Sequence, residues 1–300
     1  MGPSSPLTVD GAAIGRATAN EPDPIFAPGR RIELPRRGTT FVREVPGPEG
    51  APTVLLLHGW VATGGLNWFQ AFDTLSDRFR VIAPDLRGHG QGIRSRRVFR
   101  LADCADDCAA TLLELGTGPV IVVGYSMGGP VAELLWRRHR DLVSGMVLCA
   151  TSAGFMPNRS ARLSYQSAML SAVTAARVAT LTRAVPSLPA WGVRPSRLPE
   201  WIADEMRRHD WRSIVEAGHS ISTFNANRWI DQVDVPTAVV CTTRDHAVRP
   251  DLQLALADAI TGATVHRVDD GHLACAQAGF GLVLRGACTN VADRVSRSVV

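Results

Sequence analysis

The chain has 300 residues, of which 45% are hydrophobic and 20% are charged, so it can bury one large core or one core that carries an inserted subdomain. Its net charge is +4, but all 32 cationic residues are arginines scattered along the chain, so we expect no nucleic-acid partner. The first residues lack the basic start and apolar core of a secretory signal, and no apolar stretch has the length of a membrane span. These features predict a cytoplasmic protein.

The first 28 residues are rich in Pro, Gly, Ser and Ala without periodicity, which predicts a flexible N-terminal arm. From residue 29 on, short apolar runs typical of strands alternate with helical patterns. The predicted strands are residues 31–34, 40–44, 53–57, 80–83, 119–123, 145–148, 237–241 and 264–268. The predicted helices are residues 68–76, 101–115, 127–139 and 252–260, with a final helix toward the C-terminus.

This alternation predicts a mostly parallel sheet covered by helices on both faces, with the first two strands as an antiparallel hairpin at one edge. Between residues 151 and 230 no strand pattern is found, and helical patterns follow one another between prolines. We therefore predict an α/β core formed by residues 29–150 and 231–300, interrupted by a helical cap of residues 151–230.

Residues 124–129, Gly-Tyr-Ser-Met-Gly-Gly, lie between a predicted buried strand and a predicted helix. A strand that turns sharply into a helix places one residue at positive φ, and side chains two positions on either side of it would collide with the turn. Gly124 and Gly128 remove those side chains, and Ser126 is left at the helix N-terminus, where developing negative charge is favoured. The pattern predicts a nucleophile elbow with Ser126 as the catalytic serine.

A serine hydroxyl is a weak nucleophile, so it needs a base, and the base needs an orienting carboxylate. His272 is the one histidine of eight that directly follows the last predicted strand, and Asp245 follows the strand before it. The rival acids either precede a strand or lie too close to His272 along the chain: Asp231, Asp234, Asp269 and Asp270. We predict a catalytic set of Ser126, Asp245 and His272.

Acyl transfer also needs hydrogen-bond donors for the oxyanion. A buried strand ends in His58-Gly59-Trp60, where glycine would let the backbone direct the N–H of Trp60 toward the pocket, opposite the N–H of Met127. We predict these two backbone N–H groups as the oxyanion hole and a structural role for His58. Residues 85–90, Asp-Leu-Arg-Gly-His-Gly, are expected to form a second loop at the same rim.

Together these motifs resemble the α/β-hydrolase superfamily, in its lid-bearing esterase-like branch, over about residues 30–290. The order Ser, Asp, His is the order that this family uses. The resemblance implies hydrolysis of an ester, a thioester or a related bond through an acyl-enzyme, without a metal or an organic cofactor. Cofactor-free haloperoxidases and carbon–carbon bond hydrolases share this triad and stay open as alternatives, as does a non-catalytic relative that binds a ligand.

The predicted cap should carry the information on substrate choice. It holds four of the seven tryptophans, together with methionines and leucine: Trp191, Trp201, Trp211, Trp229, Met156, Met169, Leu170 and Met206. Such residues pack a cap onto its core more often than they touch substrate, but their number indicates an apolar pocket. The sequence therefore predicts an esterase for small to medium apolar acyl groups, acting as a monomer or a homodimer on a small-molecule ester.

Overall fold

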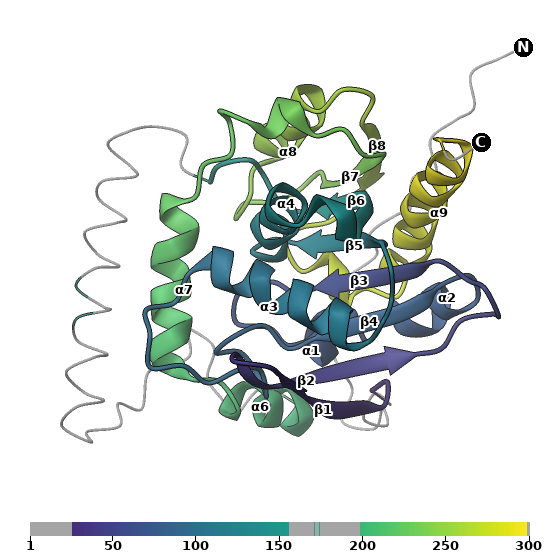
Figure 1. Ribbon diagram of the computed structural model, residues 1–300. Helices are drawn as coiled ribbons and strands as arrows, with labels where there is room; N and C mark the ends of the chain where they lie inside the picture. The colour runs from purple at the N-terminus through teal and green to yellow at the C-terminus, as the bar shows by residue number, and fades with distance from the viewer. Residues whose placement is uncertain (1–25, 156–170, 172–173, 175–198, 299–300) are drawn as a thin grey trace, which may run out of the picture.

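The computed structural model of the chain describes residues 26–155, 171, 174 and 199–298 (Figure 1). Nearly all of the predicted arm, and most of residues 151–198 of the predicted cap, lie outside these ranges. The described strands form one eight-stranded sheet in the order β1-β2-β4-β3-β5-β6-β7-β8. They are β1 (Gly29–Leu34), β2 (Gly38–Val45), β3 (Thr53–Leu57), β4 (Arg80–Pro84), β5 (Val120–Tyr125), β6 (Val143–Cys149), β7 (Thr237–Thr242) and β8 (Thr264–Val268).

The sheet is parallel from β4 to β8, and β2 is antiparallel to both β1 and β4 at one edge. Strands β3, β5 and β7 are buried along their whole length, which explains why they are continuous apolar runs rather than alternating ones. The predicted sheet and its edge hairpin are confirmed.

Helices cover both faces of the sheet (Figure 1). One face carries α3 (Leu101–Glu114), α4 (Gly128–Arg138) and α8 (Pro250–Ala259). The other carries α1 (Gly64–Trp68), α2 (Phe72–Ser76) and α9 (Phe280–Ser298). Two helices of the predicted cap are described, α6 (Glu200–Arg207) and α7 (Trp211–Thr223), with short 3₁₀ turns at η1 (Arg140–Leu142), η3 (Ile230–Gln232) and η4 (Ala274–Ala276).

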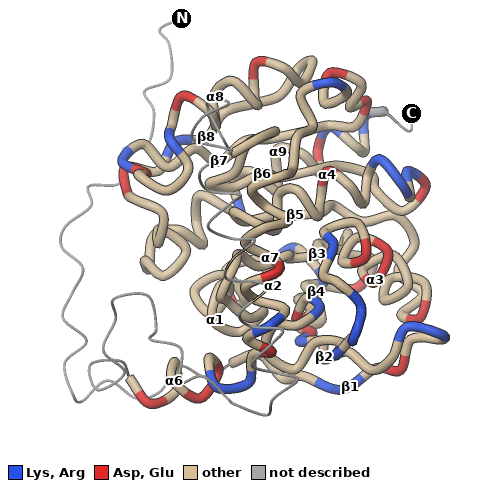
Figure 2. Tube along the Cα trace, turned by 90° about the vertical axis from the view of Figure 1, so that its left-hand side faces the viewer, with Lys and Arg blue, Asp and Glu red and all other residues tan. Residues whose placement is uncertain are grey.

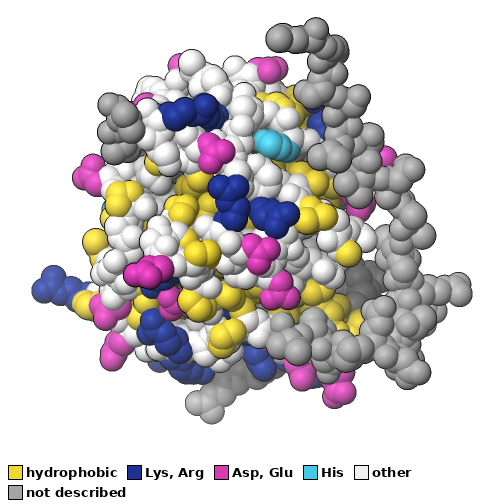
Figure 3. All heavy atoms as spheres, turned by 90° about the vertical axis from the view of Figure 1, so that its right-hand side faces the viewer, with side chains coloured by type: hydrophobic (Ala, Val, Ile, Leu, Met, Phe, Trp, Pro, Cys, Tyr) yellow, Lys and Arg dark blue, Asp and Glu magenta, His cyan; other side chains and the backbone are white. Residues whose placement is uncertain are grey.

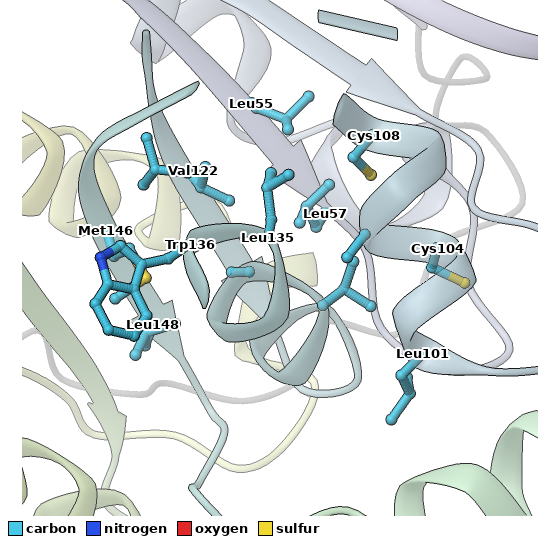
Figure 4. Packing of buried hydrophobic residues seen from close by; sticks show 14 of the residues in the cluster. Leu55, Leu57, Leu101, Cys104, Cys108, Val122, Leu135, Trp136, Met146 and Leu148 are labelled. Atoms are coloured by element: carbon cyan, nitrogen blue, oxygen red, sulfur yellow. The ribbon is translucent and has the colours of Figure 1, made fainter. Parts of the chain in front are cut away.

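Each face of the sheet buries its own apolar core. In the first, Leu135 and Trp136 of α4 lie against the strand residues Leu55, Val122 and Met146 (Figure 4). All six cysteines are buried and free.

The single helix predicted over residues 68–76 is wrong, because the chain forms two short helices there. Thr63 begins α1 earlier by accepting a hydrogen bond from the N–H of Leu66 (3.1 Å), and Ala71 N–H bonds to Trp68 O in a tight turn that ends it. Trp68, Phe72 and Leu75 are all buried. The helical spacing of apolar residues therefore continues across the break between α1 and α2, and this spacing alone does not indicate where a helix ends.

The surface near α9 carries arginines interspersed with Asp and Glu rather than gathered into one basic patch (Figure 3). Among the helices in the described ranges, none combines the length and the apolar character needed to cross a bilayer.

Glu133 lies on α4 with no exposed surface, and neither carboxylate oxygen has a hydrogen-bond partner among the described residues. Burial raises the pKa of Glu133 well above its usual range. Because the unfolded chain loses this proton at lower pH than the folded chain does, the folded state binds more protons above about pH 4.5, and stability falls as the pH rises.

We therefore expect Glu133→Leu to stabilise the protein by about 1–3 kcal/mol, since it removes a buried polar group that has no described partner. The gain should be larger at pH 8 than at pH 5, as measured by urea unfolding at both pH values. Glu133→Gln serves as the matched variant, because it removes the ionisation but keeps a polar group. A loss of stability in both variants at pH 8 would show that the carboxylate is satisfied.

Candidate active site

Ser126 stands between the end of β5 at Tyr125 and the start of α4 at Gly128, and its φ is 52°. Its N–H bonds to Cys149 O on the neighbouring strand (2.9 Å), and its carbonyl accepts from Thr151 Oγ1 (2.8 Å). A Cβ on Gly124 would lie 2.4 Å from Gly128 O, and one on Gly128 would lie 2.1 Å from Leu57 O. The turn therefore has room for no side chain at these two positions.

Three predicted residues form one hydrogen-bonded chain. The Ser126 hydroxyl lies 2.9 Å from His272 Nε2, and His272 Nδ1 lies 2.7 Å from Asp245 Oδ2. His272 follows β8 and Asp245 follows β7, so both come from the carboxyl end of the sheet. The side chain of Asp245 has no exposed surface, whereas that of His272 is 27% exposed. In this arrangement the imidazole can take a proton from the serine while the carboxylate orients it.

Asp245 is held by several donors besides His272. Its Oδ1 accepts the N–H groups of Ala247 (2.8 Å) and Val248 (2.9 Å), and its Oδ2 accepts the hydroxyl of Thr242 (2.8 Å). Burial raises the pKa of Asp245, but the bonds from His272, Val248 and Thr242 outweigh it, so the pKa lies below its usual value. The carboxylate is therefore ionised at neutral pH.

Tyr125 holds two parts of the candidate site together, a role that the sequence pattern did not indicate. Its hydroxyl donates to the backbone carbonyl of His272 (2.9 Å), and its buried ring contacts the rings of Trp68 and Phe280 edge-on. It therefore ties the loop that carries His272 to the strand that carries Ser126. The apolar strand pattern indicated only that Tyr125 is buried, and gave no sign of where its hydroxyl points.

The predicted oxyanion turn lies beside the serine, since a Cβ on Gly59 would be 3.4 Å from Ser126 Cβ. Gly59 N–H donates to Asn67 Oδ1 (2.9 Å) and the indole N–H of Trp60 donates to Ile214 O on α7 (2.8 Å). The residue of this turn with a positive φ is Val61 (58°). The backbone turn that was expected at Gly59 is therefore made at Val61 instead. The assignment of the Trp60 and Met127 N–H groups to an oxyanion hole stays a prediction.

The loop after β4 is tied to the oxyanion turn through Asp85. Its carboxylate accepts the N–H of Gly64 and the N–H of Gln91, each at 2.8 Å. Burial raises the pKa of Asp85 to about 6, although both N–H bonds oppose this. His58 Nε2 accepts from Leu86 N–H (2.9 Å), and burial lowers the pKa of His58 to about 3, so it is neutral. His58 therefore braces the loop, as predicted.

Arg87 and His89 of this loop also brace it. The guanidinium of Arg87 donates twice to Asp107 on α3 (2.8 and 2.7 Å), and His89 is fully buried beside His58. His209, between α6 and α7, is also buried, and its Nδ1 accepts from Gly90 N–H (2.9 Å). This contact ties the loop to the segment between the two helices, and the local sequence pattern does not encode it.

The tryptophans of the predicted cap that lie in described residues are packed against other rings. Trp229 stacks on Trp136 of α4 with ring centroids 6.3 Å apart, and Trp201 meets the rings of Phe26 and Phe69 edge-on. Trp211 contacts His209. Trp191, Met156, Met169 and Leu170 lie outside the described residues. Trp201 and Trp229 thus anchor this segment to the core.

Glu205 of α6 makes a buried polar contact between this segment and the core. It accepts the hydroxyl of Thr63 (2.6 Å) and a guanidinium N–H of Arg208 (2.5 Å), and lies 3.7 Å from the buried guanidinium of Arg43 on β2.

In the part of the chain that the structure describes, no three His, Cys, Asp or Glu side chains gather as metal ligands would.

A mostly parallel sheet with a strained serine directly after a central strand is the architecture of α/β hydrolases. The chain belongs to the alpha/beta hydrolase fold family, whose family model matches residues 52–278.

Comparisons with known proteins agree with this assignment. A hydrolase from Pseudomonas aeruginosa PA01 superposes with a TM-score of 0.71 at 19% identity, covering 88% of this chain and 98% of that chain. A thermophilic esterase from Thermogutta terrifontis gives a TM-score of 0.69 at 26% identity, and the match covers 90% of this chain and 99% of that chain. A segment of 102 residues, 34% of this chain, is 37% identical to the pimeloyl-(acyl-carrier protein) methyl ester esterase of Vibrio cholerae. That segment covers 38% of the relative, and the chain spans less than half the length of the first curated relatives that it matches.

The contacts of Glu205 predict that Glu205→Gln destabilises the protein by about 3 kcal/mol, because it leaves the buried guanidinium of Arg43 without its carboxylate. Urea unfolding of the variant measures this loss. Glu200→Gln is the matched control, since Glu200 is exposed at the start of the same helix. Equal stability of the two variants would show that the buried ion pair contributes nothing.

Proposed function

We propose that the protein is a serine hydrolase that cleaves carboxylic esters through an acyl-enzyme intermediate, with Ser126 as nucleophile. The observation that carries the proposal is the hydrogen-bonded chain from Ser126 to His272 (2.9 Å) and from His272 to Asp245 (2.7 Å). It joins a serine on a strained turn, a part-exposed imidazole and a buried carboxylate.

In the proposed reaction, Ser126 Oγ attacks the ester carbonyl while His272 Nε2 takes the hydroxyl proton. The N–H groups of Trp60 and Met127 stabilise the oxyanion of the tetrahedral intermediate. The alcohol then leaves with the proton from His272, and water attacks the acyl-enzyme by the same route. Asp245 accepts from Nδ1–H, which keeps Nε2 free to act as the base. These residues supply every proton transfer, so the mechanism needs neither a metal nor an organic cofactor.

The esterase from Thermogutta terrifontis and the aligned segment of the Vibrio cholerae esterase support this choice of bond. For the acyl group, the apolar composition of residues 151–230, which hold four of the seven tryptophans, favours small to medium apolar acyl groups. We propose that the substrate is a small-molecule ester of this type.

Replacing the nucleophile should abolish turnover while leaving the fold intact. We expect Ser126→Ala to lower kcat for p-nitrophenyl butyrate by about a thousandfold or more, since loss of a triad member removes the covalent route. Ser76→Ala, on the exposed end of α2, should retain full activity. The same two variants are treated with a fluorophosphonate, which should label the wild type and Ser76→Ala but not Ser126→Ala. If Ser126→Ala kept more than a few per cent of the wild-type turnover, Ser126 would not be the nucleophile. If the wild type were labelled but hydrolysed no ester, the protein would instead be a ligand-binding relative.

Acyl chain length is expected to change specificity in a defined way. Each added methylene that an apolar pocket buries contributes up to about 0.8 kcal/mol, until the pocket is full. We therefore expect kcat/KM for p-nitrophenyl esters from acetate to palmitate to rise, reach a maximum at about four to eight carbons, and fall. A flat profile, or a preference for acetate alone, would contradict an apolar acyl pocket.

A further inference from the structure

A pocket of about 520 Å³ lies apart from the residues of the proposed catalytic site. It is lined by Arg31 of β1, Thr39 of β2, residues 90–92 and Arg94 after β4, and Arg208 at the end of α6. Figure 2 shows α6 and β1 at the same end of the molecule, both with arginine segments. The lining holds three guanidinium groups and no carboxylate.

Arg94 is fixed in place by backbone carbonyls. Its Nη2 donates to Gly90 O (2.5 Å) and to the carbonyl of Arg208, and its Nη1 donates to Gly92 O (3.1 Å). These bonds hold the planar group rigidly but leave its charge without a counter-ion, because carbonyl oxygens are neutral. A guanidinium that is already oriented loses little conformational entropy when it binds an anion.

The charges around the pocket do not balance. Arg208 is paired with Glu205 (2.5 Å), but among the described residues neither Arg31 nor Arg94 has a carboxylate within ion-pair distance. Burial lowers the pKa of Arg94 and the charge of Arg31 lowers it further, although Asp210 and Asp85 oppose this. Asp85 accepts two loop N–H groups and Asp210 caps α7. Two like charges thus share one pocket.

We propose that this pocket binds a phosphate-bearing small molecule, with the phosphate between Arg31 and Arg94. A phosphate monoester carries nearly two negative charges at neutral pH, which matches the two uncompensated guanidinium groups. The guanidinium fork of Arg31 can bind two phosphate oxygens, while Arg94, whose Nη2 is held by carbonyls, supplies its charge and its remaining N–H groups. A volume of about 520 Å³ is in the range of small-molecule sites. The site is separate from ester hydrolysis, so the proposal holds whether or not the protein cleaves esters.

Isothermal titration calorimetry with sodium pyrophosphate, at constant ionic strength set with potassium chloride, tests the proposal on the full chain. We expect saturable binding of one equivalent and a dissociation constant about tenfold higher in Arg31→Gln, since one charge-assisted interaction is lost. Arg94→Gln should weaken binding at least as much.

The matched control is Arg30→Gln. Adjacent residues of a strand point to opposite faces, and Arg30 pairs with Glu44 (3.4 Å) outside the pocket, so the control removes the same charge from the same strand. Its dissociation constant should stay within about twofold of the wild type. The proposal fails if binding does not saturate, if Arg30→Gln weakens binding as much as Arg31→Gln, or if malonate binds as tightly as pyrophosphate.

Discussion

The strained turn at Ser126 is the constraint on which the site depends. A non-glycine residue at positive φ costs about 1–3 kcal/mol, so the surrounding structure has to hold it there. It does so from both sides, because Ser126 N–H bonds to β6 and Gly128 packs against the end of β3 without room for a side chain. The hydroxyl is thereby aimed outward at the start of α4, and the positions of all other groups in the site are defined relative to it.

Parallel strand order supplies those other groups. Because β5, β6, β7 and β8 are neighbours and parallel, the segments that leave β7 and β8 open at the same edge as the serine. Asp245 and His272 can therefore reach each other although 27 residues separate them along the chain. Tyr125 then fixes the spacing between the strand end and the histidine loop, so the geometry is set by a bond to the backbone as well as by the contacts among Ser126, His272 and Asp245.

The sequence predicted those parts that depend on local pattern: the strand positions in a mostly parallel sheet with an edge hairpin, the serine turn, and a histidine and an acid at strand ends. It did not predict contacts between distant segments, because the spacing of apolar residues indicates which side chains are buried but not which residues they contact. Trp229 was expected to pack the cap onto the core, but nothing in the local pattern named Trp136 as the ring that it stacks on. The bond that His209 accepts from Gly90 is likewise absent from any local pattern, and the break between α1 and α2 was missed because the apolar period crosses it.

The described cap helices are bonded to the same loops that shape the site. Trp60 donates from the oxyanion turn to α7, Glu205 of α6 accepts from Thr63 at the end of that turn, and His209 accepts from the loop after β4. Asp85 joins the two loops to each other, so a shift of α6 or α7 would be transmitted to the turn beside Ser126. The residues that bond α6 and α7 to the core and those that shape the turn at Gly59 and Trp60 therefore form one hydrogen-bonded unit, and a substitution in either part should alter the geometry around Ser126.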